Sequence, residues 1–218
     1  MKKYVNLFVF VFMIGACLSQ GRAQTKSAVS YKNPVVDIAM PDPTVIKATD
    51  GYFYVYATES TRNVPIMKSK DLVEWTYCNT AFTNKTRPRF EPKAGIWAPD
   101  INYINGKYVL YYAMSVWGGE QTCGIGVATA DSPQGPFTDH GKMFRSNEIG
   151  VQNSIDPSLL QYEGRNYLVW GSFRGIYVIE LTADGLSIMP GAKKKRIAGT
   201  AFEAVYIHKH GDYYYMFA

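Results

Sequence analysis

The chain has 218 residues, of which 15% are aromatic and only 19% are charged, and it contains 19 glycines and 11 prolines. This composition excludes intrinsic disorder, which combines few aromatic residues with high charge, and it excludes a coiled coil. Three cysteines are too few for a disulfide scaffold. Many aromatic residues together with many turn formers favour an all-β globular chain.

The first 23 residues have the features of an export signal. Lys2 and Lys3 precede an apolar stretch at 7–16, and Ala23 completes a small-x-small cleavage site. A competing motif ends at Cys17 and resembles the lipobox of bacterial lipoproteins, in which this cysteine would be lipidated. We therefore expect an exported protein, periplasmic or extracellular, with an outer-membrane lipoprotein anchored through Cys17 as the alternative.

The net charge of +5 comes mainly from this leader. Cleavage after Ala23 would remove three basic residues and no acidic one, which leaves +2. A nearly neutral chain has no electrostatic footprint for nucleic acid. The basic run Lys193–Arg196 follows Pro190-Gly191, which indicates a solvated turn. Cys78 and Cys123 show no motif in their spacing, and we expect them to stay unpaired.

A β-hairpin with an aromatic second strand recurs four times along the chain. In each unit a short strand and a Gly-containing turn precede the aromatic strand. The expected strand pairs are Thr44–Lys47 with Tyr52–Ala57, Ile101–Ile104 with Tyr108–Ala113, Ser158–Tyr162 with Tyr167–Trp170, and Ala204–His208 with Tyr213–Ala218. Further strands are expected between the hairpins at Pro65–Ser69, Gly124–Ala130 and Gly175–Leu181. Three to four strands per repeat, with no crossover helices, predict the blades of a β-propeller.

An acidic residue introduces each hairpin in a similar setting, at intervals of 58, 56 and 47 residues: Asp42, Asp100, Asp156 and Glu203. Equivalent ends of the innermost strands of a propeller meet around one axis, so we expect these acids to converge in one pocket. An Asp beside proline also commonly stabilises a turn, and Asp100 is the acid for which a structural role is most favoured. Metal binding is the competing use of such a cluster, because calcium takes six or more oxygen ligands.

Clustered carboxylates indicate acid–base chemistry. They repel one another, so at least one of them keeps its proton to a higher pH. Two carboxyls with separated pKa values supply the acid and the base that hydrolysis of a glycosidic bond requires. Trp97 lies near Asp100 and offers a platform for a sugar ring, with packing inside a blade as the alternative.

Five motifs stand in order along the chain: Pro41-Asp42-Pro43, Trp97-Ala98-Pro99-Asp100-Ile101, Ser154-Ile155-Asp156-Pro157, Trp170-Gly171-Ser172-Phe173 and Phe202-Glu203-Ala204. Together they resemble glycoside hydrolase family 43, the five-bladed β-propeller enzymes, and most of all its endo-1,5-α-L-arabinanase branch. The resemblance runs from about Asn33 to the last residue. We therefore expect a signal peptide at 1–23 and a partial glycosidase domain at 33–218.

The resemblance implies a role for each of three acids. Asp42 matches the general base that activates water, Glu203 matches the general acid that protonates the departing sugar, and Asp156 matches the carboxylate that tunes and orients the acid. The family inverts configuration, so base and acid are expected about 6.5–9.5 Å apart. The expected reaction is hydrolysis of α-1,5-linked arabinan.

The resemblance also suggests which residues bind the carbohydrate substrate: Trp97, Asp100, Asn153 and Ser172. Of these, Asn153 and Ser172 would hydrogen-bond sugar hydroxyls or else satisfy polar groups at the blade ends. No cofactor is expected to be required. The family often holds calcium or another ion on its axis, with a histidine in a segment that has no match here, so no metal ligand is assigned. Three histidines are interpreted as structural or solvated: His140, which is expected in a turn, His208 and His210.

Two departures from the family pattern limit these expectations. The repeats amount to about three and a half of five blades, an incomplete ring that would expose the faces of the first and last blades. We therefore expect a truncated, monomeric arabinanase of low stability and activity. Arg174 stands where arabinanases often carry an aromatic residue. An exo-acting β-xylosidase or α-L-arabinofuranosidase and an inactive carbohydrate-binding fragment stay open as alternatives.

Overall fold

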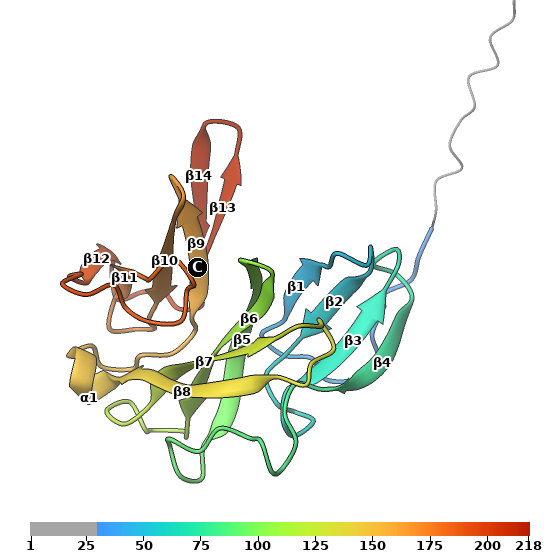
Figure 1. Cartoon of the computed structure of the whole chain (residues 1–218), viewed down its shortest axis with the longest axis horizontal. Helices are drawn as coiled ribbons and strands as arrows, with labels where there is room; N and C mark the ends of the chain where they lie inside the picture. The colour runs from blue at the N-terminus through green and yellow to red at the C-terminus, as the bar shows by residue number, and fades with distance from the viewer. Residues whose placement is uncertain (1–29) are drawn as a thin grey trace, which may run out of the picture. The chain divides into compact units, whose positions relative to one another are not determined.

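The structure, a computed structural model, describes residues 30–218 (Figure 1). The predicted signal peptide at 1–23 and the lipobox at Cys17 lie outside these residues. In the described part of the chain, no helix has both the length and the apolar character needed to cross a bilayer. Cys78 and Cys123 are both free thiols, and Cys123 is buried.

The described residues form fourteen strands in four antiparallel sheets and one short helix, α1 (Ser146–Ile149). The first sheet has the order β1 (Thr44–Lys47), β2 (Phe53–Tyr56), β3 (Pro65–Ser69) and β4 (Trp75–Thr80). The second has the order β5 (Gly95–Ile104), β6 (Lys107–Ser115), β7 (Gly124–Ala130) and β8 (Thr138–Arg145). The third consists of β9 (Ser158–Tyr162), β10 (Arg165–Trp170), β11 (Ile176–Glu180) and β12 (Lys195–Ala198). The fourth is the hairpin of β13 (Tyr206–His210) and β14 (Tyr213–Phe217).

The four predicted hairpins are confirmed, and with them three blades and half of a fourth. The outermost strands β4, β8 and β12 were not predicted, because they are short or polar and largely exposed. Two predictions are wrong for the same reason. His140 lies on β8 rather than in a turn, and the end of the basic run Lys193–Arg196 lies on β12, where exposed lysine and arginine suit an edge strand.

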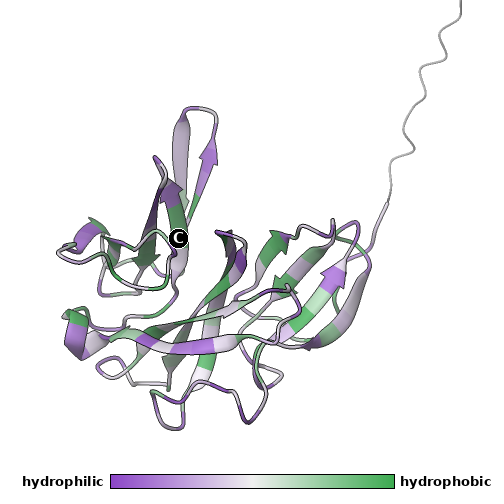
Figure 2. Cartoon of the chain, in the orientation of Figure 1, coloured by the Kyte–Doolittle hydropathy of each residue, from purple (hydrophilic) through white to green (hydrophobic). Residues whose placement is uncertain are grey.

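The core explains the aromatic composition. Tyr111 and Tyr112 are neighbours on β6 and both are fully buried, yet they belong to different hydrophobic clusters. Side chains alternate between the two faces of a strand, so Tyr112 packs towards the first sheet and Tyr111 towards the third. The second sheet is thus covered on both faces, and Figure 2 shows how hydrophobic and hydrophilic residues alternate along the strands.

The first and fourth sheets leave apolar side chains exposed. Val45 on β1 is 49% exposed, and on the hairpin Tyr213 is 70% and Phe217 59% exposed. This agrees with the prediction that an incomplete ring exposes the faces of its first and last blades. The first strands of successive sheets contact one another, β1 with β5, β5 with β9, and β9 with β13. The turns that precede these strands therefore lie near one another.

Candidate active site

A residue with left-handed backbone precedes each of these first strands or interrupts it: Asp42 (φ 48°), Ala98 (φ 40°), Asp156 (φ 57°) and Ala204 (φ 54°). Residues other than glycine seldom adopt this conformation, and such strain clusters at functional sites. These four positions are equivalent in the repeat. The predicted equivalence of the four acids is therefore wrong for Asp100, two residues after Ala98, and for Glu203, one residue before Ala204. In β5 the difference is accommodated by a bulge between Trp97 and Asp100.

The turns border a pocket with a volume of about 560 Å³, a size suited to a small ligand. Three of the four predicted acids line it, together with three of the four predicted substrate-binding residues: Asp42, Asp156, Glu203, Trp97, Asn153 and Ser172. Residues that are 161 positions apart in the chain thus meet in one place, as the repeat predicted.

Asp42 is exposed and lies in the first of these turns. Its Oδ2 accepts a hydrogen bond of 2.6 Å from Thr58 Oγ1, and Thr58 Oγ1 in turn accepts one of 2.7 Å from the backbone N–H of Ala98. Thr58 also lines the pocket and was not predicted. A lone threonine just after a strand carries no sequence motif, so only the folded arrangement identifies it.

Asp156 and Glu203 form the other acidic part of the pocket. Burial is the main cause that raises the pKa of Asp156 from 3.8 to about 7, and the nearby carboxylates of Glu203 and Asp42 raise it further. The backbone N–H of Ala204 donates to Asp156, which partly offsets this effect. Ser172 is buried, and its hydroxyl donates to Glu203 Oε2 at 3.0 Å. Ser172 therefore contacts Glu203, and both residues were predicted to belong to the site.

Asp100 does not line this pocket. It lies in an adjoining hollow that Asp42 and Asp156 also line. There its carboxylate accepts hydrogen bonds from the side chains of Asn102 and Thr44 and from the backbone N–H of Leu159. Burial raises its pKa to about 6. These contacts agree with the structural role that the sequence also favoured, and a part for Asp100 in substrate binding stays a prediction.

Aromatic side chains border the acids. Trp97 lies with its ring centroid 5.5 Å from that of Trp117, which is 94% exposed at the start of the β6–β7 connection. Phe173, which is 49% exposed, lines the pocket from the β10–β11 connection. Neither Trp117 nor Phe173 was predicted to bind substrate. The signal for Trp117 was its position after the long apolar strand β6, where a large aromatic side chain has no core to enter.

Arg174 lies beside the pocket and pairs with an acid. Its Nη2 is 3.0 Å from Glu120 Oε2, and Glu120 also accepts a hydrogen bond from Gln152. The backbone carbonyl of Glu120 accepts the N–H of Asn153 at 2.7 Å. Glu120 thereby connects three segments at the rim, and Arg174 is held by an ion pair next to the aromatic Phe173.

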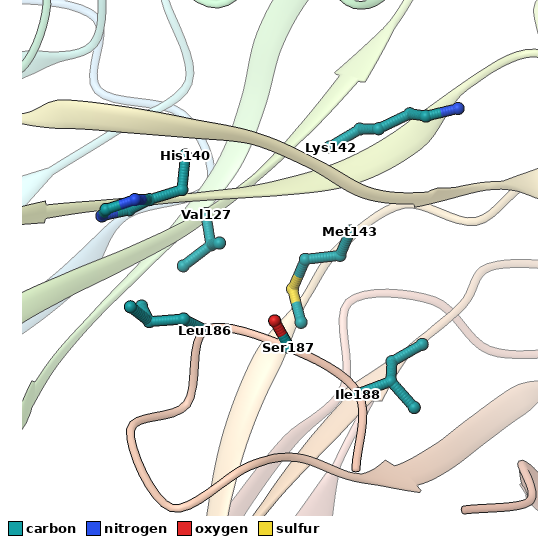
Figure 3. A pocket seen from close by; sticks show the side chains of 7 residues that line it. All are labelled: Val127, His140, Lys142, Met143, Leu186, Ser187 and Ile188. Atoms are coloured by element: carbon teal, nitrogen blue, oxygen red, sulfur yellow. The ribbon is translucent and has the colours of Figure 1, made fainter. Parts of the chain in front are cut away.

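A second hollow, with a volume of about 290 Å³, lies between β8 and the loop at 186–188 (Figure 3). Met143 extends from β8 towards Ser187, and His140 and Lys142 lie on the same strand. No carboxylate lines this hollow. Among residues 30–218, no group of three or more His, Cys, Asp or Glu side chains has an arrangement that could hold a metal ion. The pocket in which Asp42, Asp156 and Glu203 meet is the candidate site for acid–base chemistry.

Comparison with known proteins agrees with this geometry. The chain is 31% identical over 185 residues to the probable arabinan endo-1,5-alpha-L-arabinosidase A of Aspergillus niger, covering 81% of this chain and 56% of that protein. It is 35% identical over 189 residues to the extracellular endo-alpha-(1→5)-L-arabinanase 1 of Bacillus subtilis, covering 80% of this chain and 57% of the relative. The chain therefore spans little more than half the length of these curated relatives.

Solved structures show the same fold. A Bacillus subtilis arabinanase is similar with a TM-score of 0.72 and 32% identity over 83% of this chain and 65% of that one. An exo-1,5-alpha-L-arabinanase from a bovine ruminal metagenomic library is similar with a TM-score of 0.70 and 30% identity over 86% of this chain and 66% of its own. The family model of glycosyl hydrolases family 43 matches residues 31–218. The fold and the acidic pocket agree with this match, which covers most of the sequence. The chain therefore belongs to glycosyl hydrolase family 43.

Proposed function

We propose that this chain is a glycosidase that hydrolyses α-1,5-linked arabinan with inversion, by cleavage within the polymer. The observation that carries the proposal is the meeting of Asp42, Asp156 and Glu203 in one pocket of a family 43 chain. Trp97 and Trp117 support a carbohydrate substrate, since exposed aromatic faces suit the apolar faces of sugar rings. The relatives described as arabinanases support arabinan.

In this proposal the three acids divide the work of a single displacement. Asp42 takes a proton from a water molecule while the water oxygen attacks the anomeric carbon, and Glu203 gives its proton to the departing glycosidic oxygen. Asp156 lies close enough to the other two acids for its pKa to respond to both. Repulsion among the ionised forms favours retention of one proton in the cluster, which an acid catalyst needs.

The test uses the full chain and linear α-1,5-arabinan. Glu203→Gln removes the proton donor while preserving size, so hydrolysis should fall at least about 100-fold, with oligosaccharide binding nearly unchanged by calorimetry. The matched control is Glu163→Gln, in the exposed turn between β9 and β10, which should keep full activity. An unmodified chain that binds arabino-oligosaccharides but never cleaves them would instead indicate a carbohydrate-binding protein.

A second candidate is exo cleavage, which the similarity to the ruminal exo-arabinanase favours. The two modes differ in their products. Endo cleavage releases mixed oligosaccharides from the start, whereas exo cleavage releases a single small product from the chain end. Early product analysis with arabinan, and with xylan oligomers for the β-xylosidase alternative, separates them.

We further propose that the protein is exported to the periplasm or the medium, or carried on the outer membrane through Cys17. The extracellular Bacillus subtilis relative supports export. The proposal includes a monomer without a nucleic-acid partner and without a required cofactor. Chelation with EDTA should then leave the activity unchanged, and fractionation of cells with and without Cys17→Ser separates a lipid anchor from simple cleavage after Ala23.

A further inference from the structure

The turn that carries Asp42 is joined to the end of β2 by two hydrogen bonds of different kinds. The backbone N–H of Thr58 donates to the carbonyl of Pro41 at 2.9 Å, and the hydroxyl of Thr58 donates to Asp42 Oδ2 at 2.6 Å. The first bond fixes the backbone of the turn whatever side chain stands at position 58. The second acts on the carboxylate itself. These two effects can therefore be separated by substitution.

The hydroxyl of Thr58 has a fixed direction. The backbone N–H of Ala98 donates to Thr58 Oγ1 at 2.7 Å, so this oxygen serves as an acceptor there. A hydroxyl has a single proton to donate. Because the N–H of Ala98 occupies a lone pair of Thr58 Oγ1, the proton of this hydroxyl points to Asp42. Thr58 is thus oriented by the strained turn of the second sheet while it holds a carboxylate of the first.

The residue after Thr58 is itself rigidly held. Glu59 forms a buried ion pair with Arg87, their side chains being 10% and 7% exposed. The Glu59 carboxylate also accepts the backbone N–H groups of Asn63 and Ile96, at 2.7 and 3.0 Å. Burial works against the ionised form, but these hydrogen bonds outweigh it and lower the pKa of Glu59. The backbone N–H of Glu59 also donates to the carbonyl of Ile96 at 3.1 Å. The segment that follows β2 and carries Thr58 and Glu59 is therefore bound to β5.

We propose that Thr58 is a positioning residue, which holds the Asp42 carboxylate in the orientation for proton transfer from the attacking water. The inference rests on the proposed role of Asp42 as the base. Asp42 is exposed, and no other side chain of residues 30–218 bonds to its carboxylate. An exposed aspartate without this bond would exchange among rotamers. With Oδ2 held by Thr58, Oδ1 remains available to accept the proton of water.

The first experiment compares Thr58→Val with Thr58→Ser in the full chain. Valine preserves the volume and the backbone bond to Pro41 but removes the hydroxyl, whereas serine restores the hydroxyl. The matched control is Thr129→Val on β7, because Thr129 Oγ1 shares a 2.7 Å hydrogen bond with His140 away from the acidic pocket. All variants are checked by thermal unfolding before kinetics on arabinohexaose.

The expected result is a fall in kcat of about ten- to 100-fold for Thr58→Val, since misplacement of a reacting group by about 1 Å can cost 100-fold. KM should change by less than about twofold, because the one proton of this hydroxyl goes to Asp42. Thr58→Ser should recover kcat to within about threefold of the unmodified chain. A Thr58→Val variant with unchanged kcat, or a Thr58→Ser variant as slow as valine, overturns the proposal.

A second measurement does not depend on turnover. Crystal structures of the unmodified chain and of Thr58→Val should show the same backbone at Pro41–Pro43, with the Asp42 carboxylate rotated or in several orientations only in the variant. A carboxylate that keeps its position without the hydroxyl overturns the proposal even if the chain is active. If the unmodified chain and Thr129→Val both fail to cleave arabinan, the proposed function fails, and the carboxylate orientation alone decides the role of Thr58.

Discussion

The carboxylate of Asp100 accepts a hydrogen bond of 2.7 Å from the backbone N–H of Leu159, which lies 59 residues later in the chain. The same carboxylate accepts hydrogen bonds from Asn102 at 2.7 Å and from Thr44 at 3.4 Å. It therefore ties together the first strands of three sheets, β1, β5 and β9. An acid that the sequence analysis placed among the substrate-binding candidates thus has the contacts of a connection between blades.

Replacement of Asp100 by alanine should destabilise the chain without altering its chemistry. The variant leaves the N–H of Leu159 without its acceptor, and an unsatisfied buried donor costs about 1–3 kcal/mol. Urea unfolding followed by tryptophan fluorescence should show this loss relative to Asp212→Ala, a control in the exposed turn between β13 and β14. kcat on arabinan should stay within about twofold. Equal free energies of unfolding for the two variants would show that the hydrogen bonds of Asp100 contribute nothing to stability.

Stability should fall as pH rises from about 4 to about 7. The pKa of Asp156 is about 7 in the folded chain, above the ordinary value of 3.8 that applies when the chain is unfolded. The folded chain therefore binds this proton more tightly than the unfolded chain. Protonation therefore favours the folded state within this window, and ionisation on the alkaline side removes that advantage. Asp100, with a pKa of about 6, acts in the same direction.

The variant Asp156→Asn checks the origin of this pH dependence. Above pH 7 its free energy of unfolding should exceed that of the unmodified chain by about 1 kcal/mol or more, and its unfolding temperature should be higher. Its stability should also depend less on pH. The measurement is thermal unfolding in a series of buffers from pH 4 to pH 8. A pH dependence that survives the substitution unchanged would assign the effect to other groups.

Much of the fold could be predicted because the repeated hairpins combine two local signals. Aromatic and β-branched residues mark strands such as Tyr108–Ala113, which is buried on both faces, and a Gly-containing turn fixes each hairpin. The outermost strands could not be predicted, since strands such as β8 and β12 face solvent and owe their pairing to a neighbour rather than to their own composition. In such strands apolar and polar residues alternate only weakly along the sequence, so the strands are hard to recognise from it.

The site was predictable only to the extent that the repeat places equivalent turns together. Asp42 and Asp156 follow that rule, and both have left-handed backbone. Asp100 departs from it because Ala98 occupies the equivalent left-handed position, and Asp100 stands two residues later, after the bulge in β5. Thr58 has no marker in the sequence, since its role depends on hydrogen bonds between segments 16 and 40 residues apart.

Gly95 should be required for the position of Trp97. A methyl group on Gly95 would stand 2.5 Å from Nε1 of the Trp97 indole, closer than a Cβ atom is found to any neighbour. Gly95→Ala should therefore displace the indole and raise KM for arabinan about tenfold, with a smaller effect on kcat. Gly199→Ala is the matched control, because a methyl group there meets nothing within 4 Å. Equal KM values for the two variants would exclude Trp97 from substrate binding.

Trp117 should contribute to substrate binding through its exposed face. It is 94% exposed and lies against Trp97, so no core packing explains its position. Trp117→Ala should weaken binding of arabino-oligosaccharides about tenfold, the effect of losing about 1.4 kcal/mol, while Trp117→Phe keeps an aromatic face and loses less. Stability should hardly change, because little of this side chain is buried on folding. Calorimetric titration of the Glu203→Gln background measures binding without turnover, and an unaltered affinity in Trp117→Ala would place the sugar elsewhere in the pocket.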